Sequence, residues 1–231
     1  MNTEILTIPC LQDNYAFIIH NHKLNETFLI DAPESHPIID ILEKKNWGLE
    51  KIVLTHHHSD HVMGVSDLVK KYDPSIIGAD ADKHRLPILG EMINANTILT
   101  LGDLKFEIID VPGHTIGHLA FYCQEISALF SGDSLMAYGC GRLFEGTPAM
   151  MWNSLNKLKK LYPKIRFVKN YKDILKVESN INLISIASYD DNHFEQLVWF
   201  IKERKDIIVE KPMVVSIKNL NQIKRLVSKY K

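Results

Sequence analysis

A run of seven residues, Thr55-His56-His57-His58-Ser59-Asp60-His61, constrains this chain more than any other feature of its sequence. It directly follows Lys51-Ile52-Val53-Leu54, which predicts a short buried strand. A strand end that turns sharply can direct alternate side chains toward one point. The run offers imidazole and carboxylate groups, which zinc and similar divalent ions accept as ligands. It therefore predicts a metal site rather than a His-rich surface turn, with these candidate ligands: His56, His58, Asp60 and His61.

Two later segments add potential ligands, again at predicted strand ends. His114 follows the apolar run 106–110, and Asp133 follows the strand expected near 127–131. Gly113 and Gly132 precede them, and glycine permits tight turns. Three strand ends would then deliver metal-binding groups to one site. Because a metal with an open position can lower the pKa of bound water to about 7, the pattern predicts hydrolytic metal chemistry.

The other histidines of this region are interpreted as non-ligands. In an extended segment, the side chain of His57 points away from those of His56 and His58, so we do not expect it to bind the metal. We expect His118 to be a structural histidine or to support the ligands. The remaining early histidines are assigned to surface or loop positions: His20, His22, His36 and His84.

Three motifs resemble the metallo-β-lactamase superfamily in order and spacing. They are the run at 55–61, Gly-His-Thr-Ile-Gly-His at 113–118 and Phe-Ser-Gly-Asp-Ser at 130–134. Within that superfamily, the segments 8–15 and 139–147 resemble glyoxalase II, the hydroxyacylglutathione hydrolase. The resemblance extends over residues 1–165.

This resemblance implies a two-metal site whose ligands are His56, His58, His114, Asp60, His61 and Asp133. The three histidines named first would hold one ion, Asp60 and His61 the second, and Asp133 would bridge both. Zinc is the expected metal, with iron or manganese as alternatives. A metal-bound hydroxide would attack the thioester carbonyl of an S-(2-hydroxyacyl)glutathione. Asp60 and Asp133 would also orient the water, which gives them a catalytic role.

Two residues are candidate substrate contacts under the same resemblance. Arg142 would bind a glutathione carboxylate, with a surface salt bridge as the alternative interpretation, and Phe144 belongs to the same motif. The expected partner is therefore a small glutathione thioester.

The chain departs from the family where the last metal ligand should be. The family places a histidine in a Gly-His-Glu-Tyr segment, but this chain has Lys169-Asn170-Tyr171-Lys172 after the strand expected at 165–168. Asn170 falls near the ligand position, yet amides are poor zinc ligands. The only later histidine is His193. We therefore expect an incomplete second metal site and reduced activity.

Composition changes near residue 165, as at a junction between modules. Residues 1–165 carry a net charge of −6 and residues 166–231 a net charge of +5, and every glycine lies at or before Gly146. The tail predicts a βαβα unit with strands at 181–187 and 206–209 and helices at 193–205 and 216–230.

The tail resembles the later half of the nucleotide-binding domain in the glucose–fructose oxidoreductase and inositol dehydrogenase family. The segments 188–193 and 210–213 carry this resemblance, and that family uses the lysine of Glu-Lys-Pro, here Lys211, near the nicotinamide. A dinucleotide fold begins with a glycine-rich phosphate turn, and the tail has no glycine. We therefore interpret Lys211 as a surface lysine and expect no nicotinamide cofactor.

The sequence thus predicts two modules, a hydrolase domain over 1–165 and a partial Rossmann-like fragment over 166–231. A natural fusion, an engineered chimera and a sequence-assembly error all fit this arrangement. Two other functions stay open. The first is a hydrolase of the same fold with another substrate, or an inactive chimera. The second is a remnant of a nicotinamide-dependent oxidoreductase.

The predicted fold class is α+β or α/β. Helices at 36–46, 62–72 and 148–161 alternate with strands at 51–54 and 75–79 and with strands near 97–111, 119–124 and 127–131. This order favours a metallo-β-lactamase-type αβ/βα sandwich with the site along one edge, followed by the βαβα fragment. The tail would either extend one sheet or remain a separate, partly packed unit.

Bulk properties fit a cytoplasmic enzyme. A net charge of −1 gives no electrostatic reason to expect nucleic-acid binding. The sequence has no run of 18 apolar residues, so it predicts no membrane partner. The chain starts without the basic segment of a signal peptide, and three widely spaced cysteines favour a reducing compartment. The oligomeric state is left open by the sequence.

Overall fold

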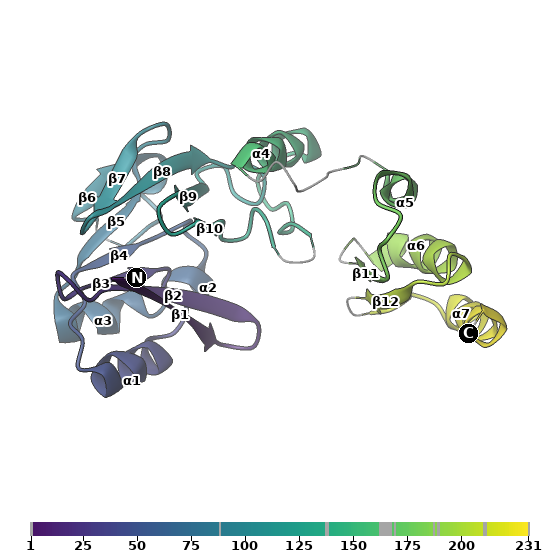
Figure 1. Cartoon of the computed structure of the whole chain (residues 1–231), viewed down its shortest axis with the longest axis horizontal. Coiled ribbons are helices and arrows are strands. Elements are labelled where there is room, and N and C mark those ends of the chain that lie inside the picture. The colour runs from purple at the N-terminus through teal and green to yellow at the C-terminus, as the bar shows by residue number, and fades with distance from the viewer. Residues whose placement is uncertain are drawn as a thin grey trace. The chain divides into compact units, whose positions relative to one another are not determined.

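Two β-sheets form the core of the first part of the chain (Figure 1). The computed structural model describes residues 2–87, 89–136, 139–161, 168, 170–186, 188, 190–209 and 212–230. The six-stranded sheet has the order β1 (Thr3–Cys10), β2 (Asn14–Asn21), β3 (Glu26–Ile30), β4 (Lys51–Val53), β5 (Ser75–Ala79) and β6 (Glu91–Ile93). Neighbouring strands are antiparallel from β1 to β3 and parallel from β3 to β6.

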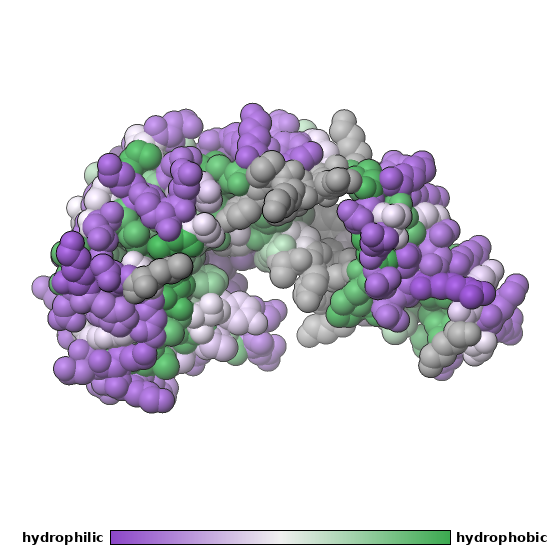
Figure 2. Space-filling view, in the orientation of Figure 1, coloured by the Kyte–Doolittle hydropathy of each residue, from purple (hydrophilic) through white to green (hydrophobic). Residues whose placement is uncertain are grey.

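The second sheet has four antiparallel strands. Its order is β10 (Ala128–Phe130), β9 (Leu119–Cys123), β8 (Leu104–Asp110) and β7 (Ile98–Leu101). Helices α1 (Ser35–Lys45) and α3 (Val65–Tyr72) lie on one side of the six-stranded sheet, and the four-stranded sheet lies on the other (Figure 1). Figure 2 shows hydrophilic side chains over the outer surface of α1.

Adjacent strand residues explain this layering, because successive side chains point to opposite faces of a sheet. Ile18 and Leu29 pack with α1 and α3 residues in one buried cluster. Their neighbours Ile19 and Ile30 pack with residues of the four-stranded sheet, such as Phe106, in another. All five side chains are almost fully buried. Apolar runs in these central strands therefore follow from burial on both faces of the sheet.

The fold class predicted from the sequence is confirmed, with local corrections. The helix expected at 62–72 is divided into α2 (Ser59–Val62) and α3. A Cβ at Gly64 would lie 2.8 Å from the Glu34 carbonyl carbon, and Gly64 N donates to Ala32 O. The break at Gly64 thus lets the backbone between α2 and α3 pass close to the 32–35 segment. The short strand β6 was not predicted.

The chain forms two compact units. One comprises residues 1–134 and 142–155, and the other comprises 135–141 and 156–231. Helix α4 (Pro148–Leu161) spans the division. Residues 162–167 lie outside the described part of the chain, and so does most of the strand expected at 165–168. The module boundary near residue 165 therefore stays a prediction.

The second unit contains the βαβα order predicted for the tail. After η2 (Tyr171–Asp173) and α5 (Ile174–Val177), which were not predicted, come β11 (Leu183–Ile186), α6 (Asp190–Lys202), β12 (Asp206–Val209) and α7 (Ile217–Tyr230). The two strands pair in parallel as a separate sheet, so the described tail strands do not extend either sheet of the first unit.

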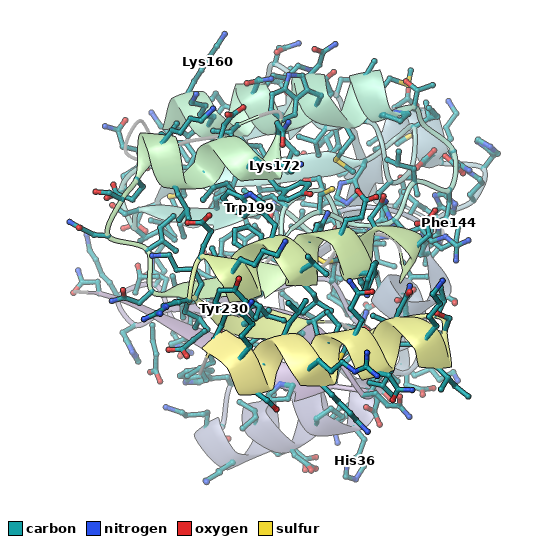
Figure 3. All side chains as sticks on the ribbon, turned by 90° about the vertical axis from the view of Figure 1, so that its right-hand side faces the viewer. His36, Phe144, Lys160, Lys172, Trp199 and Tyr230 are labelled. Atoms are coloured by element: carbon teal, nitrogen blue, oxygen red, sulfur yellow. The ribbon has the colours of Figure 1, made fainter. Side chains whose placement is uncertain are left out.

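The tail has a small apolar core of its own. Ile184 and Ile186 are buried against Phe200 of α6, whereas Leu183 and Ile208 are about half exposed. Figure 3 shows α6 and α7 side by side, with Trp199 and Tyr230 labelled on them. None of the described helices combines the length and the hydrophobicity needed to span a bilayer.

Candidate metal centre

His56 stands just after the end of β4 and is 1% exposed. Its Nδ1 lies 3.0 Å from Thr55 Oγ1, while its buried Nε2 has no hydrogen-bond partner. Burial, and then the neighbouring imidazoles, hold the pKa of His56 far below its usual range. A neutral ring therefore presents a lone pair with nothing bound to it. Because buried polar atoms are normally paired, this orphaned nitrogen fits a metal ligand.

His58 and His114 complete the first group. His114 Nδ1 donates to the backbone oxygen of Arg142 at 2.6 Å, which leaves Nε2 as an acceptor. That Nε2 lies 2.8 Å from Nδ1 of His58. Burial and the His114 imidazole lower the pKa of His58. His56, His58 and His114 each offer an atom within 4.8 Å of the others, an arrangement suited to one divalent ion.

Asp133 joins a second group with His56 and His61, whose offered atoms also lie within 4.8 Å of one another. Asp133 Oδ1 is 3.2 Å from His61 Nε2, and Oδ2 is 3.3 Å from His114 Nε2. Its carboxylate therefore lies between the two groups. The preceding Gly132 has φ +46°, and a Cβ there would lie 2.7 Å from Thr55 Oγ1, so this turn needs glycine.

Asp31 contacts the ring nitrogen of His61 opposite to the one that faces Asp133. Asp31 Oδ2 lies 2.9 Å from His61 Nδ1, and the two Asp31 oxygens accept from the Thr55 backbone N–H and hydroxyl, each at 2.8 Å. Burial alone would lower the pKa of His61, but Asp31 and Asp133 raise it to about 10. The protonated ring thus lies between two carboxylates, and a metal ion at Nε2 must displace the proton that faces Asp133.

Asp60, a predicted ligand, belongs to neither group. Its Oδ2 accepts from Asn14 Nδ2 at 3.1 Å, and the same amide donates to the Asp60 backbone oxygen at 2.9 Å. Asn14 Nδ2 also lies 3.4 Å from His61 Nε2. Asn14 thus connects the start of β2 to the ligand run.

Sequence reasoning did not select Asn14 or Asp31 as site residues. Asn14 lies in the 8–15 motif that carried the family resemblance, so a signal for it existed. Asp31 directly follows β3, and a strand-end carboxylate beside the ligand-bearing strand could have been chosen by the same rule as Asp133.

The two candidate substrate contacts lie beside the first group. Phe144, labelled in Figure 3, is 61% exposed, and its ring meets the His58 and His114 rings edge-on at centroid distances of 5.2 and 5.3 Å. Arg142 Cζ lies 5.3 Å from the centre of the Phe144 ring. An exposed aromatic ring therefore borders the histidine cluster, and the Arg142 guanidinium lies against that ring.

The histidines expected not to bind metal have other partners. His57 Nδ1 lies 3.2 Å from Asp82 Oδ2. His118 is fully buried, stacks on His56 with ring centroids 4.5 Å apart, and accepts from the Asp133 backbone N–H at 3.1 Å. Burial lowers its pKa to about 3.

The surface assignment of one histidine was wrong. His20 is 2% exposed, because it lies in β2 and stacks on Trp47 with ring centroids 3.8 Å apart. His22, His36 and His84 are exposed as expected.

The tail residues named from the sequence have structural partners. The Asn170 side chain accepts from the Lys172 backbone N–H at 3.0 Å and so caps η2. His193 is fully buried, and its two ring nitrogens face the backbone oxygens of Pro212 and Ser188 at 3.0 and 2.8 Å. His193 therefore has no ring nitrogen open to a metal. Lys211 lies outside the described residues.

Two family models match the chain. The metallo-beta-lactamase superfamily matches residues 10–168, and an oxidoreductase family with an NAD-binding Rossmann fold matches residues 150–231. Both resemblances predicted from the motifs are therefore confirmed at the level of family models.

Curated relatives match the first part of the chain. The hydroxyacylglutathione hydrolase of Ruegeria pomeroyi is 51% identical over 161 residues, covering 70% of this chain and 63% of the relative. The same enzyme from Jannaschia sp. is 50% identical over 160 residues, covering 69% and 62%. The chain thus spans less than two thirds of the length of these relatives.

Solved structures share the fold. The BLEG-1 B3 metallo-β-lactamase superposes with a TM-score of 0.64 at 22% identity, covering 68% of this chain and 87% of that one. TTHA1623 in a di-iron-bound form superposes with a TM-score of 0.57 at 26% identity, covering 68% and 86%.

Proposed function

The chain belongs to the metallo-β-lactamase superfamily, and from this membership we propose that it is a metal-dependent thioester hydrolase acting on S-(2-hydroxyacyl)glutathione. One observation carries the proposal. Two groups of imidazole and carboxylate side chains converge from separate strand ends, and His56, which belongs to both groups, has a buried Nε2 without a hydrogen-bond partner. The identity of about half to hydroxyacylglutathione hydrolases supports the choice of substrate.

We assign the first ion to His56, His58 and His114. The second would be held by His61 and Asp60, with Asp133 bridging the two ions. The position of Asp133 between the two groups supports its bridging role. Zinc suits this nitrogen-rich donor set, and iron or manganese would also fit the mixed His and Asp ligands. TTHA1623, which shares the fold, has been crystallised in a di-iron-bound form, and this supports iron as an alternative metal.

A bound divalent ion would supply Lewis-acid chemistry and activate water at neutral pH. The chain's own residues fix where this happens. The neutral rings of His56 and His58 present lone pairs, and Asp31 holds His61 in one orientation. Asp133 and Asp60 would accept hydrogen bonds from the attacking water and orient it toward the thioester carbonyl. A thiolate leaves without strong protonation, so the site needs no dedicated general acid.

Arg142 and Phe144 are the proposed substrate contacts. The guanidinium of Arg142 would bind a glutathione carboxylate, and the exposed ring of Phe144 would pack against the thioester chain. The Phe144 ring beside His58 and His114, with the Arg142 guanidinium against it, supports this role.

Activity is proposed to be low, because the segment that carries the family's last histidine has Asn170 instead. The side chain of Asn170 is engaged in capping η2, and His193 faces two backbone oxygens. We further propose that the hydrolase module covers residues 1–165 and that 166–231 is a partial Rossmann-like module. The three free cysteines support a reducing, cytoplasmic setting.

A second candidate function is favoured by one observation, the oxidoreductase family match over 150–231. Binding of a nicotinamide dinucleotide would support it. The absence of glycine after Gly146 argues against it, since a phosphate-binding turn needs close backbone approach.

The proposed function is tested by hydrolysis of S-lactoylglutathione. The zinc-loaded chain should hydrolyse the thioester, and a chelator should abolish the reaction until zinc is restored. The His58→Ala variant serves as a control for thioesterase contamination. A zinc-loaded chain no faster than this variant would refute the proposal.

A further inference from the structure

Four polar side chains outside both ligand groups surround the two loops that carry the first group. They come from three segments of the first unit and are His57, Asp82, Arg85 and Glu145, here called the outer cluster. Asp82 ends the short helix η1 (Asp80–Asp82) that follows β5, and it is 2% exposed. A carboxylate so deeply buried requires partners, since an unpaired buried charge is costly. Its partners show what it holds together.

Asp82 contacts both ligand-bearing loops. Its Oδ2 lies 3.2 Å from Nδ1 of His57, the residue between His56 and His58. A Cβ on Gly117, three residues after His114, would collide with the Asp82 carboxylate. The backbone at Gly117 therefore runs directly against Asp82.

Arg85 joins Asp82 to Glu145. Arg85 Nη2 donates to Asp82 Oδ1 at 2.5 Å, and Nη1 donates to Glu145 Oε1. One guanidinium thus uses two of its nitrogens on two carboxylates, a geometry that a lysine ammonium cannot reproduce. The side chain of Arg85 is 30% exposed and that of Glu145 is 25% exposed, so neither is part of the apolar core.

Glu145 connects the outer cluster to the His114 loop. Its Oε2 accepts from the Ile116 backbone N–H at 2.7 Å, and Oε1 lies 3.6 Å from His57 Nε2. The backbone N–H groups of Phe144 and Glu145 also donate to His114 O at 3.2 and 3.4 Å. The outer cluster therefore ties together the His58 loop, the His114 loop and the segment that presents Phe144.

We propose that Arg85 and Glu145, acting through Asp82 and His57, are positioning residues for the first metal ion. They set the separation of His58 and His114, whose ring nitrogens lie 2.8 Å apart, and the place of Phe144 beside them. The inference rests on the proposed function for its reaction, but its metal-binding part does not depend on hydrolysis. None of the four side chains needs to touch the ion or the thioester.

The competing explanation is that the cluster only stabilises the fold. The two explanations differ in what changes on mutation. Partly exposed ion pairs contribute little to folding, so Glu145→Gln, which leaves Arg85 on Asp82, should barely alter unfolding of the metal-free protein. Arg85→Met also removes a partner of the buried Asp82 carboxylate, so it should lower the thermal midpoint of the metal-free protein. Residues that orient metal ligands from outside the coordination sphere typically alter metal affinity or activity by about 10–100-fold.

The test compares Arg85→Met, Arg85→Lys and Glu145→Gln with the unmodified chain. Lys83→Met is the matched control, because Lys83 lies on the same turn and its ammonium pairs with the exposed carboxylate of Asp80 at 3.0 Å, away from the outer cluster. The measurements are zinc affinity, by competition with a chromophoric chelator, and the thermal midpoint of the metal-free protein. If S-lactoylglutathione is hydrolysed, kcat and KM are measured separately.

We expect zinc affinity to fall about tenfold or more in Arg85→Met and Glu145→Gln, with the thermal midpoint of metal-free Glu145→Gln close to that of Lys83→Met. Arg85→Lys should recover only a minor part of the loss, because its compact ammonium lacks the planar fork that places two nitrogens on the two carboxylates. Zinc affinity within twofold of the unmodified chain in both Arg85→Met and Glu145→Gln would overturn the proposal. So would full zinc affinity in Arg85→Lys. Failure of hydrolysis alone, with these affinity changes present, would refute the proposed function and leave the positioning role standing.

Discussion

Asp31 and His61 form a buried pair in which Asp31 Oδ2 lies 2.9 Å from Nδ1, while the opposite ring nitrogen of His61 faces Asp133 at 3.2 Å. A carboxylate behind a histidine fixes the tautomer and orientation of the ring and raises its basicity as a ligand. The Thr55 hydroxyl and backbone N–H hold the same carboxylate in place. The orientation of His61, a proposed ligand, is thus set by a residue 30 positions earlier in the chain.

Replacing Asp31 with asparagine should lower the affinity for the ion proposed at His61 by about 10–100-fold. The amide keeps the shape of the carboxylate but loses the negative charge beside the His61 ring. Metal titration followed by a competing chelator measures the effect. The matched control is Asp40→Asn, which alters an exposed carboxylate 3.4 Å from His36. Equal metal affinity in Asp31→Asn and Asp40→Asn would show that Asp31 does not act on the ligand.

His58→Ala should reduce hydrolysis at least about 100-fold, because loss of a ligand displaces the ion from its productive position. The rate of S-lactoylglutathione hydrolysis at saturating zinc measures this. His36→Ala, which changes an exposed histidine on α1, should leave the rate unchanged. We also expect Lys211→Ala to leave the rate unchanged. A large loss in the Lys211 variant would show that the tail contributes to the active site and that the predicted module boundary is misplaced.

The places where prediction succeeded share a physical cause. Residues that come just after a strand end take their direction from that strand, so the local pattern placed His56, His58 and His114 in one group, and the structure brings these three side chains together. Their role as metal ligands stays a prediction. Hydrophobic periodicity likewise predicted most helices and strands, because burial on one or both faces leaves a regular signature.

The places where prediction failed involve contacts between distant residues. The burial of His20 depends on Trp47 stacking over it, and the break in the helix at Gly64 depends on the 32–35 backbone passing close by. The partners of Asp82 come from residues 25 positions earlier and three positions later in the chain, while Glu145 joins the cluster through Arg85 from 60 positions away. No period or motif in the sequence encodes such pairings.

The stability of the metal-free protein should fall as the pH drops below 6.5. Burial lowers the pKa of His118 to about 3, whereas the unfolded residue has the usual value of 6.5. Between these values the unfolded chain takes up a proton that the folded chain does not, so acid favours unfolding. Between pH 7.5 and pH 5, the free energy of unfolding measured in urea should fall by about 2 kcal/mol more in the unmodified chain than in His118→Gln. Equal decreases in the free energy of unfolding of the two proteins would contradict the assignment of a neutral, buried His118.

Replacing the residues after 165 with a glyoxalase II ending should raise kcat/KM by at least about tenfold, and on the order of a hundredfold if the incoming histidine corrects the position of the nucleophile. The added glutathione contacts should also lower KM, since remote binding energy helps to position the thioester. A swapped chain with alanine at the incoming histidine separates the two effects. Equal kcat/KM in the original and the swapped chain, with the original already fast, would show that the tail supplies these functions itself.

The most direct test of the central claim is metal content measured beside S-lactoylglutathione hydrolysis on the same samples during stepwise zinc loading. We expect close to one firmly held ion per chain, with hydrolysis that rises with this ion and disappears when a chelator removes it. Two firmly held ions would show that the second site is complete and would contradict the predicted deficit. A chain that holds its ion and does not hydrolyse the thioester, or that hydrolyses it equally well without the ion, would contradict the proposed function.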